Sequence, residues 1–213
     1  MLFETLIVAL VAGLVFGGSI RNLPGIHLHW PGFLFAGAII RYVPHLLNSL
    51  FPSLFNKLYL NYGIALTTVA AAFFVASYVF LIAGVAVNLK EWTMYIMLAG
   101  IVMNFIVVGE NGGFMPVSAE GLAGAGFPMS RIIDGVIDLN HIITTDDTRF
   151  MFLSDIFVVT KPYPFPKLLS IGDLVMCAGL FIFMVRKLLG APFKPKYPSK
   201  SPKNGAYVDK LRV

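Results

Sequence analysis

The sequence predicts an all-α fold, a polytopic membrane helical bundle with about five transmembrane helices. Of the 213 residues, 57% are hydrophobic and 13% are charged, whereas a soluble domain carries about 25% charged residues. The apolar residues gather in runs close to the length of about 20 residues that crosses a bilayer. Basic residues gather after the last run. These three observations indicate that lipid is the main solvent of the chain.

The apolar runs set the predicted organisation along the chain. Residues 1–108 form a bundle of four spans, at about 2–20, 30–50, 62–87 and 93–108, and 169–189 is the last span. The clearest span is 62–87, which has no charged residue, and the weakest is 30–50, which carries Arg41, Pro44 and His45. If 30–50 did not cross, four spans would leave both chain ends on the inner side. We interpret 2–20 as a retained span, because it lacks the basic stretch of a signal peptide.

The distribution of lysine and arginine predicts the orientation. Residues 186–213 hold eight basic residues and one acid, and basic segments beside a span stay in the cytoplasm. Five spans then place the N-terminus outside and the C-terminus inside the cell membrane. The basic tail, residues 190–213, is expected to contact anionic lipid. This explains the basic pI without nucleic-acid binding.

The segment 109–168 is predicted to be a compact extracytoplasmic Gly/Pro-rich segment. Apolar residues recur at helical spacing in 131–143 and 149–158, which predicts short amphipathic helices lying on the membrane face or covering the bundle. Asp134, Asp138 and His141 would share one face of the first helix. We interpret that face as solvated rather than as a metal site, and we predict no metal and no cofactor.

Candidate ligand or structural residues flank this segment. Asn104 lies inside a span and needs a hydrogen-bond partner there, either another helix or a substrate. After it comes a glycine-rich loop that is either a structural turn or a ligand loop. The start of the last span resembles a capping box, although its acid could also be a proton or cation site. The candidates are Asn104, Glu110, Asn111, Gly112, Gly113, Met115, Pro116, Asp155, Ser170, Gly172 and Asp173.

Two further features were weighed in the other spans. Arg41 and His45 lie one turn apart, and they either snorkel to the interface or bind a lipid or quinone headgroup. Gly13 and Gly17 form a GxxxG pattern, which permits close helix contact or arises by chance. We find no recognisable catalytic motif, and the single Cys177 excludes cysteine-based metal sites and disulfide frameworks.

The stretches NGGFMPVS (111–118), Leu153-Ser154-Asp155-Ile156 and SIGDLVMCAG (170–179) resemble an uncharacterised family of bacterial multi-pass membrane proteins. That family pairs an N-G-G-x-M-P-V element with a later Leu-x-Asp-Ile and a terminal S-I-G-D span. The likeness covers mainly 104–180. Ser154 stands where the family pattern has glycine. The resemblance implies a bacterial membrane origin and no particular activity.

We therefore expect a non-catalytic integral membrane protein, a small accessory or scaffold subunit that contacts other membrane subunits or a second copy of itself. One alternative is an enzyme or transporter handling a lipid or small solute at the outer leaflet, with Glu110, Asn111, Asp155 and Asp173 as its candidates. The enzyme or transporter hypothesis requires Asp155 and Asp173 to converge on the Asn111 loop around a cavity. A second alternative is a quinone- or pigment-associated redox subunit.

Overall fold

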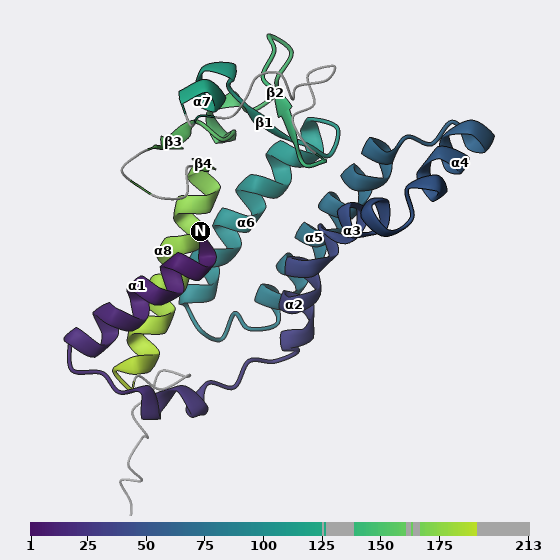
Figure 1. The fold of residues 1–213 in the computed structure, drawn as a ribbon. Helices are drawn as coiled ribbons and strands as arrows, with labels where there is room; N and C mark the ends of the chain where they lie inside the picture. The colour runs from purple at the N-terminus through teal and green to yellow at the C-terminus, as the bar shows by residue number, and fades with distance from the viewer. Residues whose placement is uncertain (125, 127–138, 161–162, 164–166, 191–213) are drawn as a thin grey trace, which may run out of the picture.

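The computed structural model describes residues 1–213 except 125, 127–138, 161–162, 164–166 and 191–213. The described part is mostly helical, with short strands between the last two long helices (Figure 1). Its elements in chain order are α1 (Leu2–Val15), the 3-10 helix η1 (Ile20–Gly25), α2 (Pro31–Ile40), α3 (Val43–Leu50), α4 (Pro52–Tyr62), α5 (Leu66–Ala86), α6 (Thr93–Glu110), β1 (Met115–Val117), α7 (Ala119–Gly124), β2 (His141–Ile143), the 3-10 turn η3 (Met151–Leu153), β3 (Phe157–Val159), β4 (Lys167–Leu169) and α8 (Ile171–Leu188).

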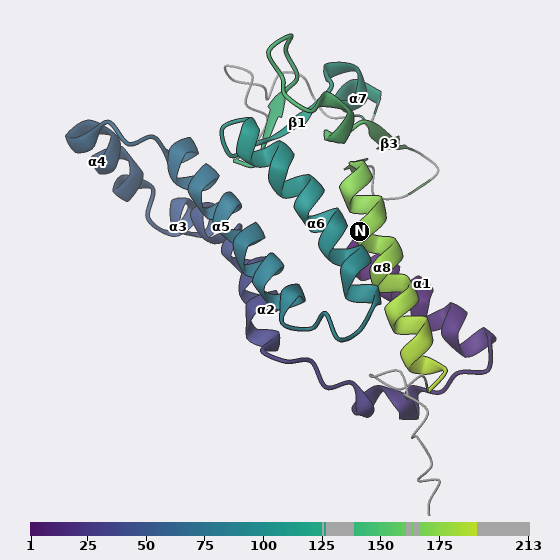
Figure 2. The same ribbon diagram turned by 180° about the vertical axis from the view of Figure 1, so that it is seen from behind.

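The long helices stand side by side in one row, in the order α1, α8, α6, α5, α2. All the strands and α7 lie at one end of this row, which we call the strand end (Figures 1 and 2). The opposite end, the linker end, holds η1, the α5–α6 turn and the end of α8. A single row covers each helix on two sides at most, so broad apolar faces stay uncovered.

Two helices, α5 and α6, are long and apolar enough to cross a bilayer. Only 39% of the residues in the apolar window of each are buried, so the rest needs an apolar solvent. The pair α2–α3 makes a third candidate if it counts as one span bent by 49°. Helix α1 is apolar but shorter, and α8 carries Asp173 in its first turn and Arg186 and Lys187 in its last. The structure thus supports two or three of the five predicted spans.

The ends of several helices differ from the predicted limits of the spans. The run 30–50 is broken between Ile40 and Val43, and Pro44, in the first turn of α3, cannot continue a helix hydrogen-bond ladder. The connection 51–61 is itself helical, as α4, which ends at Gly63 in the left-handed region (φ 68°). The first helix ends at Val15, and Gly17 (φ 87°) turns the chain.

The segment after α6 is not all-α. Among the described residues, β1 pairs in parallel with β2, and β3 pairs antiparallel with β4. The helix predicted for 149–158 is wrong, because only Met151–Leu153 forms a 3-10 turn and Phe157–Val159 is a strand. β-branched residues such as Val158 and Val159 fit a pleated strand better than a helix. In 131–143, residues 141–143 are strand β2 and 131–138 lie outside the described residues.

Glycines permit the closest helix contacts. A Cβ atom on Gly100 of α6 would overlap the Gly172 carbonyl of α8 and lie 2.5 Å from the Met176 backbone nitrogen. A Cβ on Gly179 would lie 2.7 Å from the Met97 backbone nitrogen. Backbones approach this closely only where small residues face each other. Gly13 likewise packs on the Leu188 side chain, while Gly17 of the same GxxxG pattern faces open space.

A buried ion cluster closes the linker end. Glu91, in the α5–α6 turn, accepts hydrogen bonds from Arg186 (2.6 Å) and Lys187 (2.7 Å) at the end of α8. Glu91 is 2% exposed and Lys187 is 4% exposed. The guanidinium of Arg186 also lies 5.1 Å from the centre of the Trp92 ring. Removing one partner from such a cluster strands the other charge in an apolar environment.

We predict that Gly100→Ala weakens the fold and that Gly109→Ala, in the same helix, does not. The new methyl group at position 100 meets backbone of α8, and this overpacking costs about 1–3 kcal/mol. Gly109 has no heavy atom within 4 Å of a built Cβ, so alanine there gains helix propensity. The thermal unfolding midpoint of each purified variant in mild detergent measures the difference. Equal midpoints for the two variants would contradict the close α6–α8 contact.

We predict that Glu91→Gln lowers stability by about 3–5 kcal/mol, because it removes the buried carboxylate that pairs with Arg186 and Lys187. The matched control is Lys90→Gln, which removes an exposed neighbouring charge and should stay within about 0.5 kcal/mol of the parent. The double variant Glu91→Gln with Lys187→Met should recover most of the loss in the same thermal assay. A Glu91→Gln protein as stable as the control would show that the Glu91 cluster does not contribute to the stability of the fold.

Candidate functional site

The polar residues at the strand end centre on Asn104. Its Nδ2 group donates to Asp173 Oδ1 (2.9 Å), and its Oδ1 accepts from the Ser170 hydroxyl (2.8 Å). Asn104 is 3% exposed, so this amide faces α8 rather than lipid. The expected hydrogen bond between helices is therefore present, and it fixes α6 against the start of α8.

Ser170 and Asp173 also form the predicted capping box. The Asp173 N–H donates to Ser170 Oγ (2.9 Å), and the Ser170 N–H donates to Asp173 Oδ2 (3.2 Å). Gly172, between them, has no side chain because a Cβ there would overlap the Asn104 side chain. Each polar residue of the S-I-G-D stretch thus has a structural contact, and one carboxylate serves both the helix cap and Asn104.

The glycine-rich loop after α6 is held by a second clamp. Asn111 accepts a hydrogen bond from the Arg149 N–H (3.0 Å) and donates to the Arg149 carbonyl (2.9 Å). The Arg149 side chain pairs with Glu110 at 2.9 Å. Gly112 (φ 70°) and Gly113 (φ 87°) adopt left-handed conformations that suit glycine. The loop is a turn that ties the end of α6 to the segment before η3.

The Met115-Pro116 stretch is a buried strand rather than an exposed ligand loop. It pairs with His141 and Ile142 of β2, and the Pro116 carbonyl accepts from the Asp155 N–H (3.0 Å). The Asp155 carboxylate, 5% exposed, lies 3.6 Å from His141 Nε2. The two candidate acids therefore have different partners, because Asp173 bonds Asn104 and Asp155 lies beside His141.

Arg41 and His45, the residues predicted to contact a headgroup, lie in different surroundings. The Arg41 guanidinium lies 4.5 Å from the centre of the Phe74 ring of α5 and 5.4 Å from that of Tyr42. His45 is exposed on α3. Arg41 therefore uses a cation–π contact inside the chain, and His45 points outward on a different helix.

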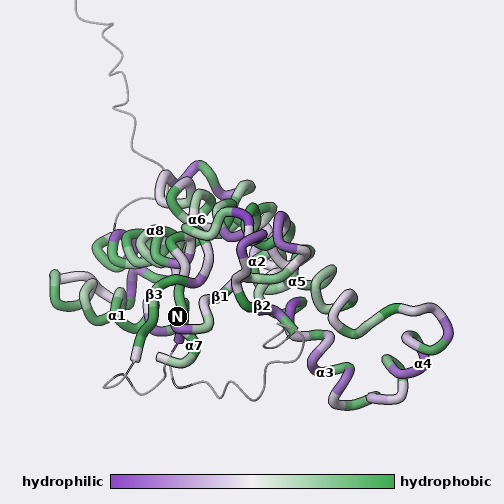
Figure 3. Tube along the Cα trace, turned by 90° about the horizontal axis from the view of Figure 1, so that it is seen from above, coloured by the Kyte–Doolittle hydropathy of each residue, from purple (hydrophilic) through white to green (hydrophobic). Residues whose placement is uncertain are grey.

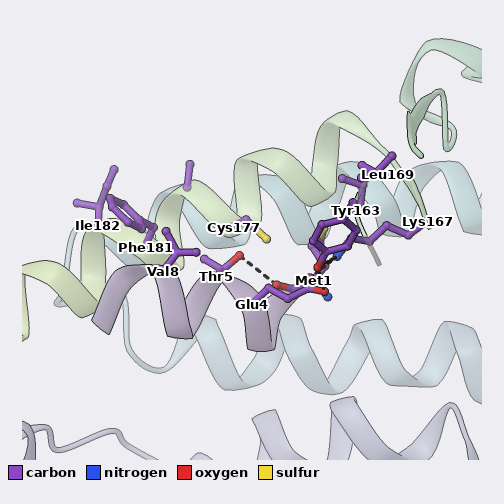
Figure 4. A pocket seen from close by; sticks show the side chains of 12 residues that line it. Met1, Glu4, Thr5, Val8, Tyr163, Lys167, Leu169, Cys177, Phe181 and Ile182 are labelled. Carbon is purple, nitrogen blue, oxygen red and sulfur yellow. Dashed lines mark hydrogen bonds and ion pairs between the residues drawn. The ribbon is translucent and has the colours of Figure 1, made fainter. Parts of the chain in front are cut away.

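A cavity of about 530 Å³ lies elsewhere, between α1 and α8 (Figure 4). Its polar groups are Glu4, Thr5, Tyr163, Lys167 and the N-terminal ammonium of Met1, which lies 2.8 Å from the Glu4 carboxylate. Its other walls are mainly apolar. None of the predicted candidate residues lines it. Sequence reasoning missed this site, because Glu4 and Lys167 are far apart in the chain. The one available signal was Glu4, the single charge in the first apolar run.

No group of three or more His, Cys, Asp or Glu side chains that could hold a metal ion occurs among the described residues. Asp134 and Asp138, weighed with His141 as possible ligands, lie outside them. The polar clusters that the structure describes can hold helices together, and the cavity can accept a ligand with both a polar and an apolar part.

Comparison with known proteins shows which family this chain is similar to. The chain is 29% identical over 92 residues to an uncharacterized protein of Thermotoga maritima, a match that covers 43% of this chain and 50% of that protein. The chain thus spans about half the length of the curated relative that it matches. No solved structure matches the chain. Residues 25–185 match the model of a family of unknown function, DUF5317. This match spans well over half of the chain, which therefore belongs to the DUF5317 family.

Proposed function

We propose that the chain is a multi-pass protein of a bacterial cell membrane and works there as a non-catalytic accessory or scaffold subunit of a larger membrane complex. The observation that carries this proposal is the arm formed by α3 and α4. The arm extends away from the row of long helices, and α4 packs mainly on α3 (Figures 1 and 3). An element that the chain leaves uncovered is best explained by a partner that covers it.

The side chains of the arm fit such a contact. Along α4, Phe55 is the one buried residue, and Leu60 and Tyr62 are 80% and 76% exposed. Tyrosine and large apolar residues are typical of binding interfaces. Asn56, Lys57 and Asn61 interrupt the apolar residues, and hydrophilic and hydrophobic stretches both occur along α4 (Figure 3). The surface is therefore amphipathic. This composition favours a contact at the bilayer boundary with a neighbouring subunit or a second copy of the chain.

The contacts of the motif residues support a structural role. Asn104, Ser170 and Asp173 bond one another, and Asn111 clamps the backbone of Arg149. A catalytic acid or base must instead reach the group that it protonates or deprotonates. The contacts that these residues make within the chain therefore favour a structural role over a catalytic one.

Five crossings are supported by the order of the row. Successive helices of the row run in opposite directions (Figures 1 and 2). Helices α1, α5 and α8 run toward the linker end, and α2 and α6 run toward the strand end. The charges of α8 lie in its first and last turns, where they reach the bilayer boundaries. The 14 residues of α1 rise about 21 Å, so this crossing needs the residues that follow Val15.

The charge distribution supports the orientation with the N-terminus outside. Arg21, Lys90, Arg186 and Lys187 lie at the linker end. The strand end carries more acids than bases in the loops after α6, although Lys57 on the arm is an exception. Because basic loops stay in the cytoplasm, the linker end is cytoplasmic in this proposal. The basic tail that follows Gly190 would then meet anionic lipid.

We predict that a cysteine at position 147 is reactive from outside intact cells and that one at position 90 is not. Asp147→Cys and Lys90→Cys are made in a Cys177→Ala background, since both positions are exposed at opposite ends. A membrane-impermeant maleimide should label the first in intact cells and the second only after permeabilisation. The reverse pattern would refute the orientation, and labelling of both in intact cells would refute the crossing of the membrane by α6.

We predict that the chain, purified in mild detergent from its native membrane, retains a stoichiometric partner through the arm. Leu60→Asp should abolish co-purification, because a charge at the centre of an apolar contact costs several kcal/mol. Phe152→Asp, at another exposed apolar position of the strand end, is the matched control and should leave assembly intact. Mass spectrometry of the eluted complex identifies the partner, and multi-angle light scattering gives its stoichiometry. A monomer in the wild type would contradict the subunit proposal.

An enzyme or transporter acting on a lipid or small solute at the outer leaflet is the second candidate, and the cavity between α1 and α8 favours it. Asp155 and Asp173 do not line this cavity, so this candidate would act through residues that do, such as Glu4, Tyr163 and Lys167. The third candidate, a quinone- or pigment-associated redox subunit, rests on Arg41 and His45. It ranks last because these side chains have the separate environments described above.

A further inference from the structure

The cavity between α1 and α8 has a polar end and an apolar body. Its polar end lies beside β4 at the strand end, where Lys167 and Tyr163 meet Glu4 of α1 (Figure 4). Its body runs along the two helices between Val8 and the pair Phe181 and Ile182. The volume of about 530 Å³ lies within the range of small-molecule sites, about 300–1,000 Å³.

Two cations, the Lys167 ammonium and the N-terminal ammonium of Met1, meet the single Glu4 carboxylate at the polar end. The Lys167 ammonium contacts the Glu4 carboxylate and lies 3.3 Å from the Tyr163 hydroxyl. A lysine ammonium has three N–H donors, and Lys167 is 22% exposed, so one donor remains for a ligand. Burial lowers the pKa of Lys167, but the hydrogen bonds to Glu4 and Tyr163 outweigh burial and raise this pKa above its ordinary value. The ammonium therefore stays charged at neutral pH.

The apolar body follows helical spacing. Cys177, Ala178, Phe181 and Ile182 project from one side of α8, and Val8 faces them from α1. Ala178 is small and exposed, which leaves the groove open there. Because the polar end and apolar body succeed each other along the helix axes, a ligand here has its polar group at the strand end and its apolar chain toward the middle of the row.

We propose that this cavity binds one phospholipid of the surrounding bilayer, with a phosphate oxygen accepting a hydrogen bond from Lys167 and one acyl chain in the α1–α8 groove. The proposal rests on the membrane placement proposed above. Lysine recognises phosphate as a compact charge, and the strand end is the outer boundary of the proposed bilayer. A headgroup at that boundary with its chain pointing to the midplane is the normal lipid orientation. The Lys167 and Met1 ammonium groups outnumber the Glu4 carboxylate, so the polar end carries a net positive charge that suits a phosphate.

The test uses the full chain in mild detergent and native mass spectrometry, with phosphatidylglycerol or diacylglycerol of the same acyl chains as probes. We expect one phosphatidylglycerol per chain. Diacylglycerol, which lacks the phosphate, should bind at least about tenfold more weakly, the scale of one charge-assisted hydrogen bond. Inorganic phosphate should not displace the lipid, because it cannot fill the groove. Displacement by phosphate, or equal binding of the two lipids, would overturn the proposal.

Two variants separate the parts of the site. Ala178→Trp fills the groove without changing a charge and should reduce lipid retention about tenfold or more. Its matched control is Ala72→Trp, at an exposed alanine of α5, which should retain lipid like the parent. Lys167→Met should reduce the preference for phosphatidylglycerol over diacylglycerol while leaving the groove intact, because one of the two cations at the polar end is lost. Equal retention by Ala178→Trp and Ala72→Trp would identify the bound lipid as part of the general lipid shell.

Carbonate extraction distinguishes failure of the lipid-site proposal from failure of the proposed membrane placement. Release of the wild-type chain by carbonate would refute its integral membrane placement and the lipid site with it. A chain that stays in the membrane but shows no effect of Ala178→Trp or Lys167→Met would refute the lipid site alone. Loss of a protein partner, measured by co-purification, bears on the arm and not on this cavity.

Discussion

The close contact between α6 and α8 is the constraint on which the other features depend. Gly100 and Gly172 bring the two backbones together, and this approach places Asn104 within hydrogen-bond distance of Ser170 and Asp173. A larger side chain at either glycine would separate the helices and leave buried polar groups without partners, a cost that exceeds the loss of packing itself. The glycines and the polar residues therefore act as one unit, in which neither is useful without the other.

Hydrogen bonds and ion pairs at both ends of α8 attach this helix to its neighbours in the row. Ser170 and Asp173 fix its start to α6, and Arg186 and Lys187 fix its end to Glu91 in the α5–α6 turn. In an apolar solvent, the hydrophobic effect does not hold neighbouring helices together, so packing and interhelical hydrogen bonds must do so. A flat row buries fewer side chains than a closed bundle, so it depends more on polar contacts between its helices. Glu91 and Lys187 are buried in this contact, whereas Arg186 is 30% exposed.

The sequence predicted the parts of this structure that depend on local chemistry. The helices around 66–86, 93–110 and 171–188 follow from apolar runs, and the Ser170 cap follows from a four-residue pattern. What it missed depends on tertiary contacts. Strands β1 and β2 are three residues each, too short to produce a periodic signal, and each is stabilised by a partner distant in the chain. The Glu91 cluster and the Glu4–Lys167 contact were missed for the same reason.

The features that folding does not explain therefore indicate where function lies. Asn104, Asn111 and Asp173 look like a site in the sequence, yet each makes contacts that the fold itself requires. The arm and the α1–α8 cavity are different, because stability alone would favour a shorter arm and a filled groove. Exposed apolar helix surface is costly unless a partner or lipid covers it. The Lys167 ammonium joins β4 to Glu4 of α1 and is still 22% exposed at the end of the groove, so it can also contact a bound headgroup. Partner contact at the arm and lipid contact at the cavity can thus coexist, since they lie at opposite sides of the row.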